Sequence, residues 1–491
     1  MAAEPIILNP IGWGQFRLLG GWRRTLGIAG AYAGGSLLIM ILLYRAMRAE
    51  TTLANFARGS LTFFLLIQSA ILVFVGTNAV KRAILRDFTT DMISSHRLTA
   101  MSGYTAALGY LTGPTSQCIA LTFVNWLICT ILAGIAGTPG SITDLLGPTM
   151  LFVIMGFLAA FCWSLQVLMA LNTRGRISVV GAFVVLGVLS NLDVLWTLPG
   201  LALVVPTYLV STLRRSSSGI TPNDLPVITS MAAQLALSFT FFLAAARKYR
   251  RDDVAAFSGA LGYCLVALCA LIAAVGMARV PTPQIPFAPP IFYSNSVHSI
   301  ATLIALALIA ILPVANAARA SAEWGRRKVK DAMFKGRRPR SFVEAVAISV
   351  ILALGILLLV LGKSSLAMIE HRKDMMPHEQ MVYCAVAFAL SLLTIGGLLR
   401  YVYSASGKVG WVIVLYLVFA WCIPMFADFS LDALTNPAAM TESGRSMLFT
   451  SSPVGAWIAS CTLLEAPVPQ GLMIQALLAA GSLWLASRAK R

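Results

Sequence analysis

Stretches of roughly 20 apolar residues with almost no charged side chain constrain this chain more than any other feature of its sequence. Twelve of them occur, near residues 25–44, 59–80, 117–137, 147–171, 178–198, 226–246, 255–278, 297–318, 343–362, 379–399, 409–428 and 469–487. A helix of this length crosses the hydrocarbon core of a bilayer. Only 11% of the 491 residues are charged and 58% are hydrophobic, which leaves too little polar surface for a soluble protein. The sequence therefore predicts an all-α polytopic membrane protein with about twelve transmembrane helices.

Lys and Arg are distributed unevenly among the segments that join these stretches. Of the 37 Lys and Arg residues, 27 fall in the alternate set of segments that begins with the N-terminus. Such an excess is typical of the cytoplasmic side of a membrane. We therefore expect a multi-pass protein of the plasma (inner) membrane with both termini in the cytoplasm. Anionic headgroups of the membrane lipids account for the net charge of +18, so no nucleic acid is expected as a partner.

The first 24 residues predict a short helix before the first span. Asn9 is suited to cap its start, and Pro10 to occupy its first position. Four apolar residues recur along it at intervals of three: Trp13, Phe16, Leu19 and Trp22. This pattern predicts a cytoplasmic interfacial helix over 1–24, although a plain linker with membrane-surface Trp residues is an equal alternative.

The two halves of the chain end in similar sequences. MAAQLALSFTFFLAAARKYRR at 231–251 and MIQALLAAGSLWLASRAKR at 473–491 both place a Gln shortly after a Met and finish in basic residues. We interpret this as a duplicated six-span unit, over 25–252 and 253–491. Since six is an even number, the two units would be parallel.

A long outer segment precedes the last span of each predicted unit, at 199–225 and 429–468. Both contain a Pro within an apolar run that is too short to span and too apolar to be a free loop. Such runs predict re-entrant or interfacial pieces, which are tolerated at membrane depth only where protein covers their backbone.

Chemically reactive side chains are scarce within the predicted spans. Four amides are the main polar side chains at depth, and interhelical hydrogen bonding is the expected role of Gln68, Asn125, Gln166 and Asn191. Asp193 and Asp428 lie near membrane edges, so no carboxylate is expected deep in a span, which counts against transport driven by an ion gradient.

No nucleotide-binding, metal-binding or catalytic motif is found. Gly362-Lys363-Ser364 resembles the end of a phosphate-binding loop, but the pattern requires Gly at position 357, where this chain has Leu. The four His residues do not form a metal site. We therefore expect a membrane transport component and not an enzyme, with no cofactor bound by this chain.

Between the second and third predicted spans lies LRDFTTDMISSHRLTAMSG at 85–103. Ile84, Phe88 and Met92 recur four residues apart and would form an apolar stripe. Polar residues occupy much of the remaining surface: Arg86, Asp87, Thr90 and Asp91. We expect a cytoplasmic helix at about 81–105, which either binds a soluble partner or lies on lipid.

This segment resembles the permease subunits of type-2 ATP-binding-cassette exporters, which commonly carry G-T-x-E-x-L-x-x-T-P-L-S between their second and third spans, followed by a Gly. The Thr of the pattern is Thr89, and its two Leu positions are occupied by Ile93 and Leu98. Asp91 replaces the Glu and Thr99 replaces the Ser, and Gly109 falls at the following Gly. The chain departs from the pattern at three positions: Phe88, His96 and Arg97. The short opening helix and the six-span unit ending in basic residues are also similar to this family.

The resemblance implies an export permease that forms the substrate pathway and is driven by a separate cytosolic ATPase subunit, which uses the ATP. The ATPase would bind the helix after the second span, through Arg86, Phe88, Thr89, Asp91, Met92, Ile93, Arg97 and Leu98. The corresponding loop of the second half, at 319–342, lacks the pattern and carries nine basic residues, which favours anchoring on anionic lipid. Either one chain forms a complete pore, or two chains pair as a homodimer.

A secondary carrier or lipid-linked-intermediate flippase with twelve spans is the alternative function. It shares the predicted topology, but it would require buried charge for coupling or for binding a headgroup. A membrane scaffold without transport activity is a further alternative.

Overall fold

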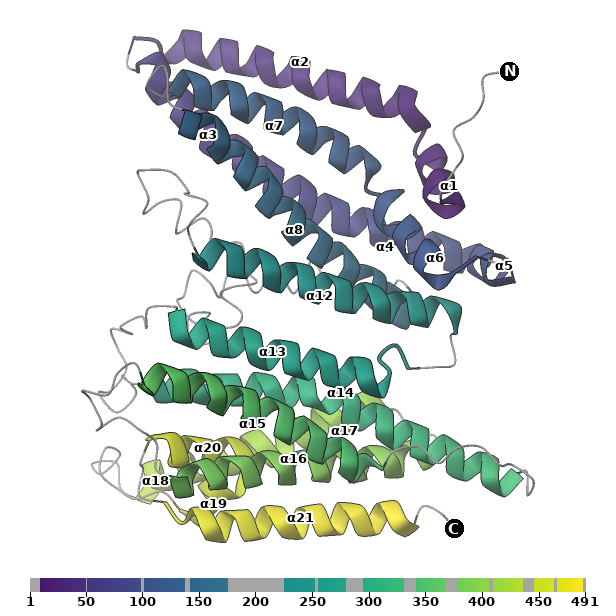
Figure 1. Cartoon of the computed structure of the whole chain (residues 1–491), viewed down its shortest axis with the longest axis vertical. Helices are drawn as coiled ribbons and strands as arrows, with labels where there is room; N and C mark the ends of the chain where they lie inside the picture. The colour runs from purple at the N-terminus through teal and green to yellow at the C-terminus, as the bar shows by residue number, and fades with distance from the viewer. Residues whose placement is uncertain are drawn as a thin grey trace. The chain divides into compact units, whose positions relative to one another are not determined.

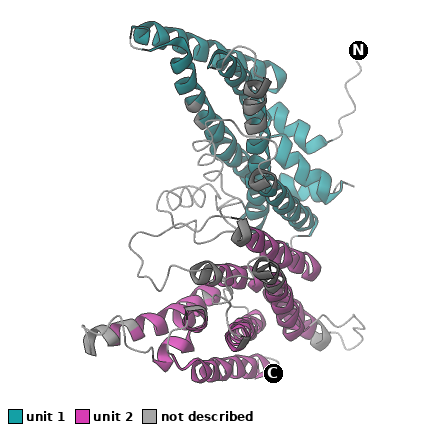
Figure 2. Ribbon diagram, turned by 60° about the vertical axis from the view of Figure 1, so that its left-hand side comes forward, with its two compact units in different colours: residues 1–191, 203–256 teal, residues 192–202, 257–491 magenta. Residues whose placement is uncertain are grey.

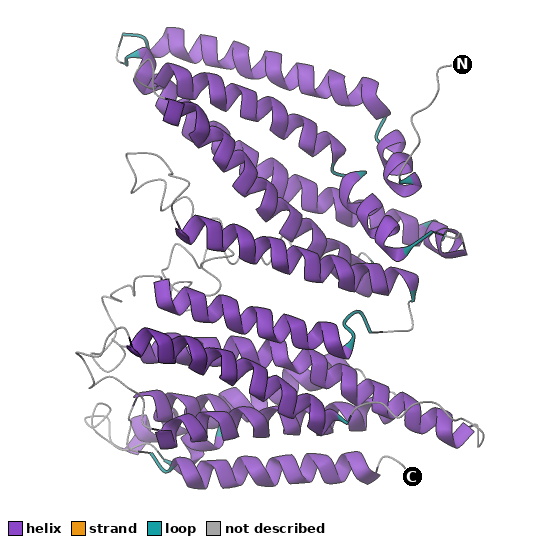
Figure 3. Ribbon diagram, viewed as in Figure 1, coloured by secondary structure: helices purple, strands orange, loops and turns teal. Residues whose placement is uncertain are grey.

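The chain folds into helices joined by turns and loops, and the part that the structure describes contains no strand (Figure 3). This structure is a computed structural model. It describes residues 9–49, 51–98, 101–136, 142–174, 225–251, 255–279, 295–330, 341–366, 378–405, 409–435, 446–462 and 466–488. The chain divides into two compact units, residues 1–191 with 203–256, and residues 192–202 with 257–491 (Figure 2).

The helices of each unit follow one another along the chain (Figure 1). Those of unit 1 are α1 (Pro10–Leu18), α2 (Gly21–Met47), α3 (Leu53–Ser69), the π-helix η1 (Ala70–Gly76), α4 (Thr77–Thr89), α5 (Met92–Leu98), α6 (Gly103–Thr112), α7 (Ser116–Ala136), α8 (Ile142–Thr173) and α12 (Leu225–Arg250). Those of unit 2 are α13 (Gly259–Arg279), α14 (Asn295–Lys330), α15 (Phe342–Leu366), α16 (His378–Ser404), α17 (Val409–Tyr416), the π-helix η5 (Leu417–Cys422), α18 (Ile423–Thr435), α19 (Met447–Ser451), α20 (Pro453–Thr462) and α21 (Val468–Arg488).

Eight helical segments of the described chain are long and apolar enough to cross a membrane. They are Gly21–Met47, Leu53–Thr89, Ser116–Ala136, Phe152–Thr173, Thr229–Arg250, Thr302–Arg326, Glu379–Ser404 and Val468–Arg488. Each coincides with a span predicted from the sequence. The chain is therefore a multi-pass integral membrane protein by helix length and hydropathy.

Three further predicted spans coincide with shorter apolar helices, at Gly259–Val275, Phe342–Ile356 and Val412–Asp428. The remaining one, at 178–198, lies outside the described residues. The count of twelve and the cytoplasmic location of both termini stay predictions.

The start of the chain folds as the sequence predicts, and then packs against protein. Asn9 caps α1 by accepting a hydrogen bond from the Gly12 amide on its side-chain oxygen, at 3.0 Å, and Pro10 begins the helix. Gly20 and Gly21 both have positive φ, at 98° and 61°, which lets the chain reverse between α1 and α2. Helix α1 packs against α6, so it is held by protein as well as by any lipid surface.

Amide side chains join the helices of unit 1, as predicted. Asn125 of α7 is fully buried and donates to the Phe64 carbonyl, at 2.8 Å, and to the Gln68 side chain of α3, at 3.2 Å. Its oxygen accepts from the Tyr32 hydroxyl of α2, at 2.8 Å. The predicted interhelical role of Asn125 and Gln68 is therefore confirmed, whereas Asn191 lies outside the described residues.

Unit 2 is organised around α16, which packs against α14, α15, α20 and α21. Its core includes Phe388 and Trp457, both without exposed surface, in tilted contact at 6.2 Å between ring centroids. Helix α14 continues to Lys330, so the first half of the predicted basic loop at 319–342 is helical and carries an Arg319–Glu323 ion pair at 2.7 Å. Its continuation, 331–340, lies outside the described residues.

The outer segment before the last span of the second half contains two short helices that other parts of the protein cover, and its re-entrant or interfacial position stays a prediction. Phe449 of α19 and Trp457 of α20 are completely buried. Ser452 separates the two helices with an extended backbone, φ −78° and ψ 135°, because Pro453 disfavours helical geometry in the residue before it. The corresponding segment of the first half falls in 199–224, outside the described residues.

Within the described residues, a π-helix interrupts one helix in each unit, and a side chain from elsewhere in the unit bonds to a carbonyl within it. In unit 1 the Trp163 indole donates to the Leu72 carbonyl of η1, at 2.9 Å. In unit 2 the Ser452 hydroxyl donates to the Trp421 carbonyl of η5, at 2.6 Å. Such π segments are rare and frequently occur at functional sites.

We expect Asn125→Leu to destabilise unit 1 by about 1 kcal/mol, because a side chain of similar size would lose its hydrogen bonds to two neighbouring helices. Tyr32→Phe removes a single one of these bonds and should cost less. Unfolding of the purified protein in mixed micelles measures both. Equal stability of Asn125→Leu and wild type would contradict the structural role of this amide.

Candidate functional site

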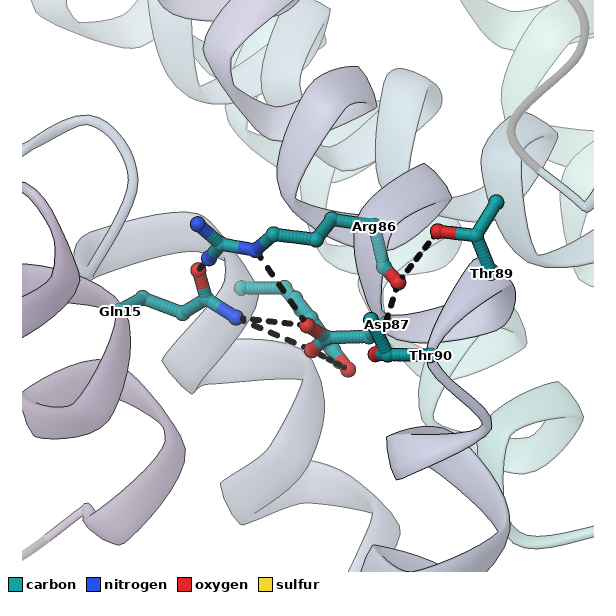
Figure 4. Close-up of polar contacts among 6 residues, drawn as sticks. Gln15, Arg86, Asp87, Thr89 and Thr90 are labelled. Carbon is teal, nitrogen blue, oxygen red and sulfur yellow. Dashed lines mark hydrogen bonds and ion pairs between the residues drawn. The ribbon is translucent and has the colours of Figure 1, made fainter.

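The segment predicted as one helix at about 81–105 is divided in the structure. Helix α4 ends at Thr89, α5 begins at Met92, and Asp91 between them has a positive φ of 55°. The hydroxyls of Thr89 and Thr90 both bond back to the Arg86 carbonyl, at 2.8 and 2.9 Å (Figure 4). The chain leaves helical geometry at Asp91, because its positive φ cannot continue a right-handed helix, and Asp adopts this conformation more readily than most residues.

At the start of α5, the Asp91 carboxylate accepts a hydrogen bond from the Ser94 hydroxyl, at 2.7 Å. Its main-chain carbonyl accepts from the Ser94 amide, at 3.2 Å. These two bonds hold the first turn of α5 against Asp91. The turn therefore redirects the chain, so that α4 and α5 are separate elements with different exposed faces.

Asp87 is buried at the centre of this end of unit 1. Only 1% of its surface is exposed, although the stripe pattern predicted it on the polar outer face. The Gln15 amide of α1 donates to its two carboxylate oxygens at 3.2 and 3.0 Å (Figure 4). The Tyr110 hydroxyl of α6 donates to it at 2.7 Å. The prediction was wrong because these donors lie on helices that the local pattern cannot place.

Arg86 is exposed and contacts both Asp87 and Gln15. Its Nε lies 3.9 Å from the Asp87 carboxylate, and its guanidinium also donates to the Gln15 side-chain oxygen. Burial raises the pKa of Tyr110 far above its ordinary value, and the Asp87 carboxylate raises it further. The phenol therefore keeps its proton and remains a donor to Asp87. Hydrogen bonds from these donors offset the free-energy cost of burying the Asp87 carboxylate. Removal of one donor would therefore destabilise the folded state.

Two glycines, one in α6 and one directly after it, let α1 come close enough for this cluster to form. A Cβ on Gly109 would lie 2.6 Å from the Asn9 side-chain oxygen, and one on Gly113 would lie 2.6 Å from the Gly12 carbonyl. Asn9 also donates to the Thr105 carbonyl of α6, at 2.6 Å. The backbones of α1 and α6 therefore pack in direct contact.

Helices α5 and α6 contact the end of α12. The Arg97 side chain donates to the Tyr249 carbonyl, at 2.8 Å, and its guanidinium lies over the Tyr249 ring, 5.9 Å from the centroid. A cation is favourable at the last carbonyls of a helix, where the backbone has no internal partner. Gly103 packs directly on the Ala246 carbonyl. Through these contacts α5 and α6 are both joined to α12, and α6 is also joined to α1 and α4.

The predicted coupling residues separate into anchored and exposed groups. Ile93 is 2% exposed, and Arg97 is half-buried against α12. Phe88 is also half-buried. Met92 is 44% exposed and Leu98 is 90% exposed. The remaining polar members are exposed: Arg86, Thr89 and Asp91. Met92 and Leu98 of α5 are therefore exposed, whereas Ile93 and Arg97 of the same helix pack against the rest of unit 1.

Sequence reasoning missed Gln15, Tyr110 and Tyr249 as parts of this site. Gly109 and Gly113 were a usable signal, because glycines four residues apart favour close helix packing. No local signal identifies Gln15 as the partner of Asp87, since 72 residues separate them.

Comparison with known proteins identifies no relative. No family model matches the chain, and neither a curated protein nor a solved structure matches it. The geometry of the site and the helical membrane architecture are therefore the basis for any functional proposal.

We expect Asp87→Asn to lower the free energy of unfolding by about 2 kcal/mol, because an amide nitrogen would then face the donors of Gln15 and Tyr110. Asp91→Asn is the matched control, since Asp91 is exposed, and it should leave stability nearly unchanged. Thermal unfolding of the two variants measures the difference. A similar small effect of both substitutions would argue against a central role for Asp87.

Gly109→Ala should force α1 away from α6 and cost about 2 kcal/mol by overpacking. Gly14→Ala adds the same methyl group to α1 where nothing lies within 4 Å, so it should be neutral or slightly stabilising. Limited proteolysis near residue 20 should be faster for Gly109→Ala only. Equal proteolysis rates for the two variants would show that α1 is not held by this packing.

Proposed function

We propose that this protein is the permease component of a membrane transport system, driven by a separate ATPase subunit that binds α5 of unit 1. The observation that carries the proposal is the exposure of Leu98, at 90%, and of Met92, at 44%, on a helix whose other side is anchored. Large apolar side chains exposed on an anchored element are typical of protein contacts. The resemblance of 88–99 to the coupling segment of type-2 exporters points to an ATPase as the partner.

The anchoring of α5 supports a mechanical role for this surface. Arg97 ties α5 to the end of α12, and the short turn at Asp91 ties it to α4. Asp87 joins α4 to α1 and α6. A displacement of α5 by a bound subunit would therefore act on the ends of α4, α6 and α12 together, instead of being lost in a flexible loop.

The distribution of basic residues supports a cytoplasmic position for this end of unit 1. The last turn of α12 carries Arg247, Lys248 and Arg250, and that of α1 carries Arg17. Cations concentrate on the cytoplasmic side of membrane proteins, where an ATPase has access to ATP. In this proposal the chain binds no nucleotide itself. We further propose export as the direction, on the family resemblance alone.

A secondary carrier is the second candidate function. The observation that favours it is a small space within unit 2, next to the buried polar side chains of Ser391, Tyr416 and Gln475.

Met92→Asp and Leu98→Asp should each weaken ATPase binding at least tenfold, because a charge would replace an apolar contact at the proposed interface. Ser95→Asp is the matched control, since it adds the same charge at an exposed position of α5 without removing an apolar side chain. Co-purification of the ATPase from cells that make each variant, followed by titration of the purified subunits, measures the effect.

All three variants should retain wild-type thermal stability, because the replaced side chains are exposed. An ATPase that binds all three variants as tightly as wild type would refute the assignment of α5 as the coupling helix. Uphill transport by the purified chain in vesicles, on an ion gradient and without ATP, would favour the carrier.

A further inference from the structure

The π-helix η1 lies within the longest helical segment of unit 1. Leu53–Thr89 runs through α3, η1 and α4 without a break and contains 37 residues. An α-helix of that length measures roughly 55 Å, well beyond the ~30 Å hydrocarbon core of a bilayer. The sequence of η1, AILVFVG, is apolar, whereas α4 carries Lys81, Arg82, Arg86 and Asp87. The interruption therefore falls where this helix changes from apolar to polar.

The two regular parts of this helix are each held by other helices of unit 1. Asn125 of α7 donates to the Phe64 carbonyl of α3, at 2.8 Å. Asp87 of α4 accepts hydrogen bonds from Gln15 of α1 and Tyr110 of α6. A change in the geometry of the segment Leu53–Thr89 is therefore easiest between these two attachments, where η1 lies.

Trp163 of α8 packs directly on the π turn. Its indole nitrogen donates to the Leu72 carbonyl, at 2.9 Å. A Cβ on Gly76 would lie 2.6 Å from the same nitrogen, so the indole ring rests on the backbone of Gly76. A side chain that bonds to a helix carbonyl from outside is a recognised cause of irregular helical geometry. Trp163 therefore stabilises η1 at the position where it is seen.

The hydroxyl side chains on the two sides of η1 differ in their hydrogen bonding. Ser69, directly before η1, donates to the Leu65 carbonyl four residues earlier, at 3.1 Å. Thr77, directly after η1, is completely buried, and its hydroxyl has no hydrogen-bond partner among the residues that the structure describes. The main-chain amide of Thr77 bonds to the Phe74 carbonyl, three residues earlier instead of four.

The π geometry explains why the Thr77 hydroxyl lacks a partner. Three threonines in regular helices of unit 1 donate to the carbonyl four residues earlier, at 2.7 to 2.8 Å: Thr122, Thr130 and Thr240. The corresponding acceptor for Thr77 is the Val73 carbonyl, which lies in the π turn. Hydrogen bonds in a π-helix span five residues instead of four, so this carbonyl is displaced from the Thr77 hydroxyl. A buried hydroxyl without a partner costs free energy, which disfavours the observed geometry.

We propose that the π turn is a two-state switch. In the state described here, Trp163 bonds to the Leu72 carbonyl and the Thr77 hydroxyl has no partner. In the second state the π turn lies closer to the start of α3, residues 73–77 form a regular α-helical turn, and Thr77 donates to the Val73 carbonyl. Each state gains a buried hydrogen bond that the other lacks, so neither has a large excess of such bonds.

The switch changes helix packing at membrane depth while α4 keeps its contacts with α1 and α6. Residues over which a π turn passes rotate by up to about 100°, the angle that one residue adds in an α-helix. In the observed state η1 buries Leu72 and Val73 and exposes Phe74 and Val75. The rotation would change which of these side chains pack against α7 and α8. This switch requires no ATPase, so it goes beyond the proposed function and is tested separately from it.

Fluorine NMR of the purified full-length protein in micelles tests the proposal. Phe74 is replaced by 4-trifluoromethylphenylalanine, because it lies within η1 and is 40% exposed. Trp163→Phe keeps an aromatic ring but removes the bond to the Leu72 carbonyl. We expect this substitution to raise the ratio of a second resonance to the first about tenfold over the wild-type protein, because it destabilises only the observed state.

Thr77→Val should have the opposite effect, because it removes the hydroxyl whose hydrogen bond stabilises the second state. Added to Trp163→Phe, it should lower the second resonance about tenfold. Trp126→Phe and Thr122→Val are the matched controls. The Trp126 indole donates to the Thr149 hydroxyl instead of a helix carbonyl, and Thr122 is buried with its hydroxyl bonded. Neither control should change the ratio of the two resonances.

A single, unchanged resonance in Trp163→Phe would overturn the proposal. A second resonance that keeps its intensity when Thr77→Val is added would also overturn it, because the Thr77 hydroxyl would then have no part in the second state.

Thermal unfolding of Thr77→Val alone gives a test that does not depend on the folding of Trp163→Phe. The melting temperature should stay unchanged or rise, because a buried hydroxyl without a partner is removed. Thr122→Val should lower it, because its hydroxyl is bonded to the Cys118 carbonyl. Equal decreases in both variants would contradict the proposal, since Thr77 would then have a partner in the observed state.

Discussion

Every backbone amide and carbonyl within the apolar part of this protein has to find a partner in the protein itself. The long helices meet that requirement internally, but their ends and interruptions do not. At those places a side chain supplies the bond. Asn9 caps the start of α1, Arg97 bonds to a carbonyl at the end of α12, and Ser452 bonds to a carbonyl within η5. These three side chains therefore form their hydrogen bonds where a helix begins, ends or changes its geometry.

The two units use buried polar groups in different ways. In unit 1 the donors of Gln15 and Tyr110 satisfy the Asp87 carboxylate, so the cluster holds α1, α4 and α6 together. A satisfied cluster of this kind rigidifies its surroundings and can transmit a displacement applied to α5. In unit 2 the buried side-chain oxygen of Gln475 has no hydrogen-bond partner among the residues that the structure describes. The polar cluster of unit 1 therefore joins helices through complete hydrogen bonding, which is why it is the basis of the coupling proposal.

Much of the helical framework was predictable because it depends on properties local to the sequence. Among the described residues, all eight membrane-length helices fall where apolar runs predicted them. The cap at Asn9, the interhelical role of Asn125 and the protein-covered helices α19 and α20 also followed from residue type and position. The break at Asp91 was not predicted, because residue type does not indicate its positive φ, which only the structure shows. The predicted exposure of Asp87 was wrong, since its donors lie 72 and 23 residues away in the sequence.

The sequence by itself determined that this is a multi-pass helical membrane protein, because hydropathy adds up along a continuous stretch and the length of that stretch is set by the bilayer. Only the tertiary structure decided which polar side chains are buried with hydrogen-bond partners and which are exposed. Asp87 and Asp91 are four residues apart and chemically identical, yet one is buried among donors and the other is exposed. The reason is physical: burial and hydrogen bonding depend on which helix faces meet, and that choice is made between segments far apart in the chain.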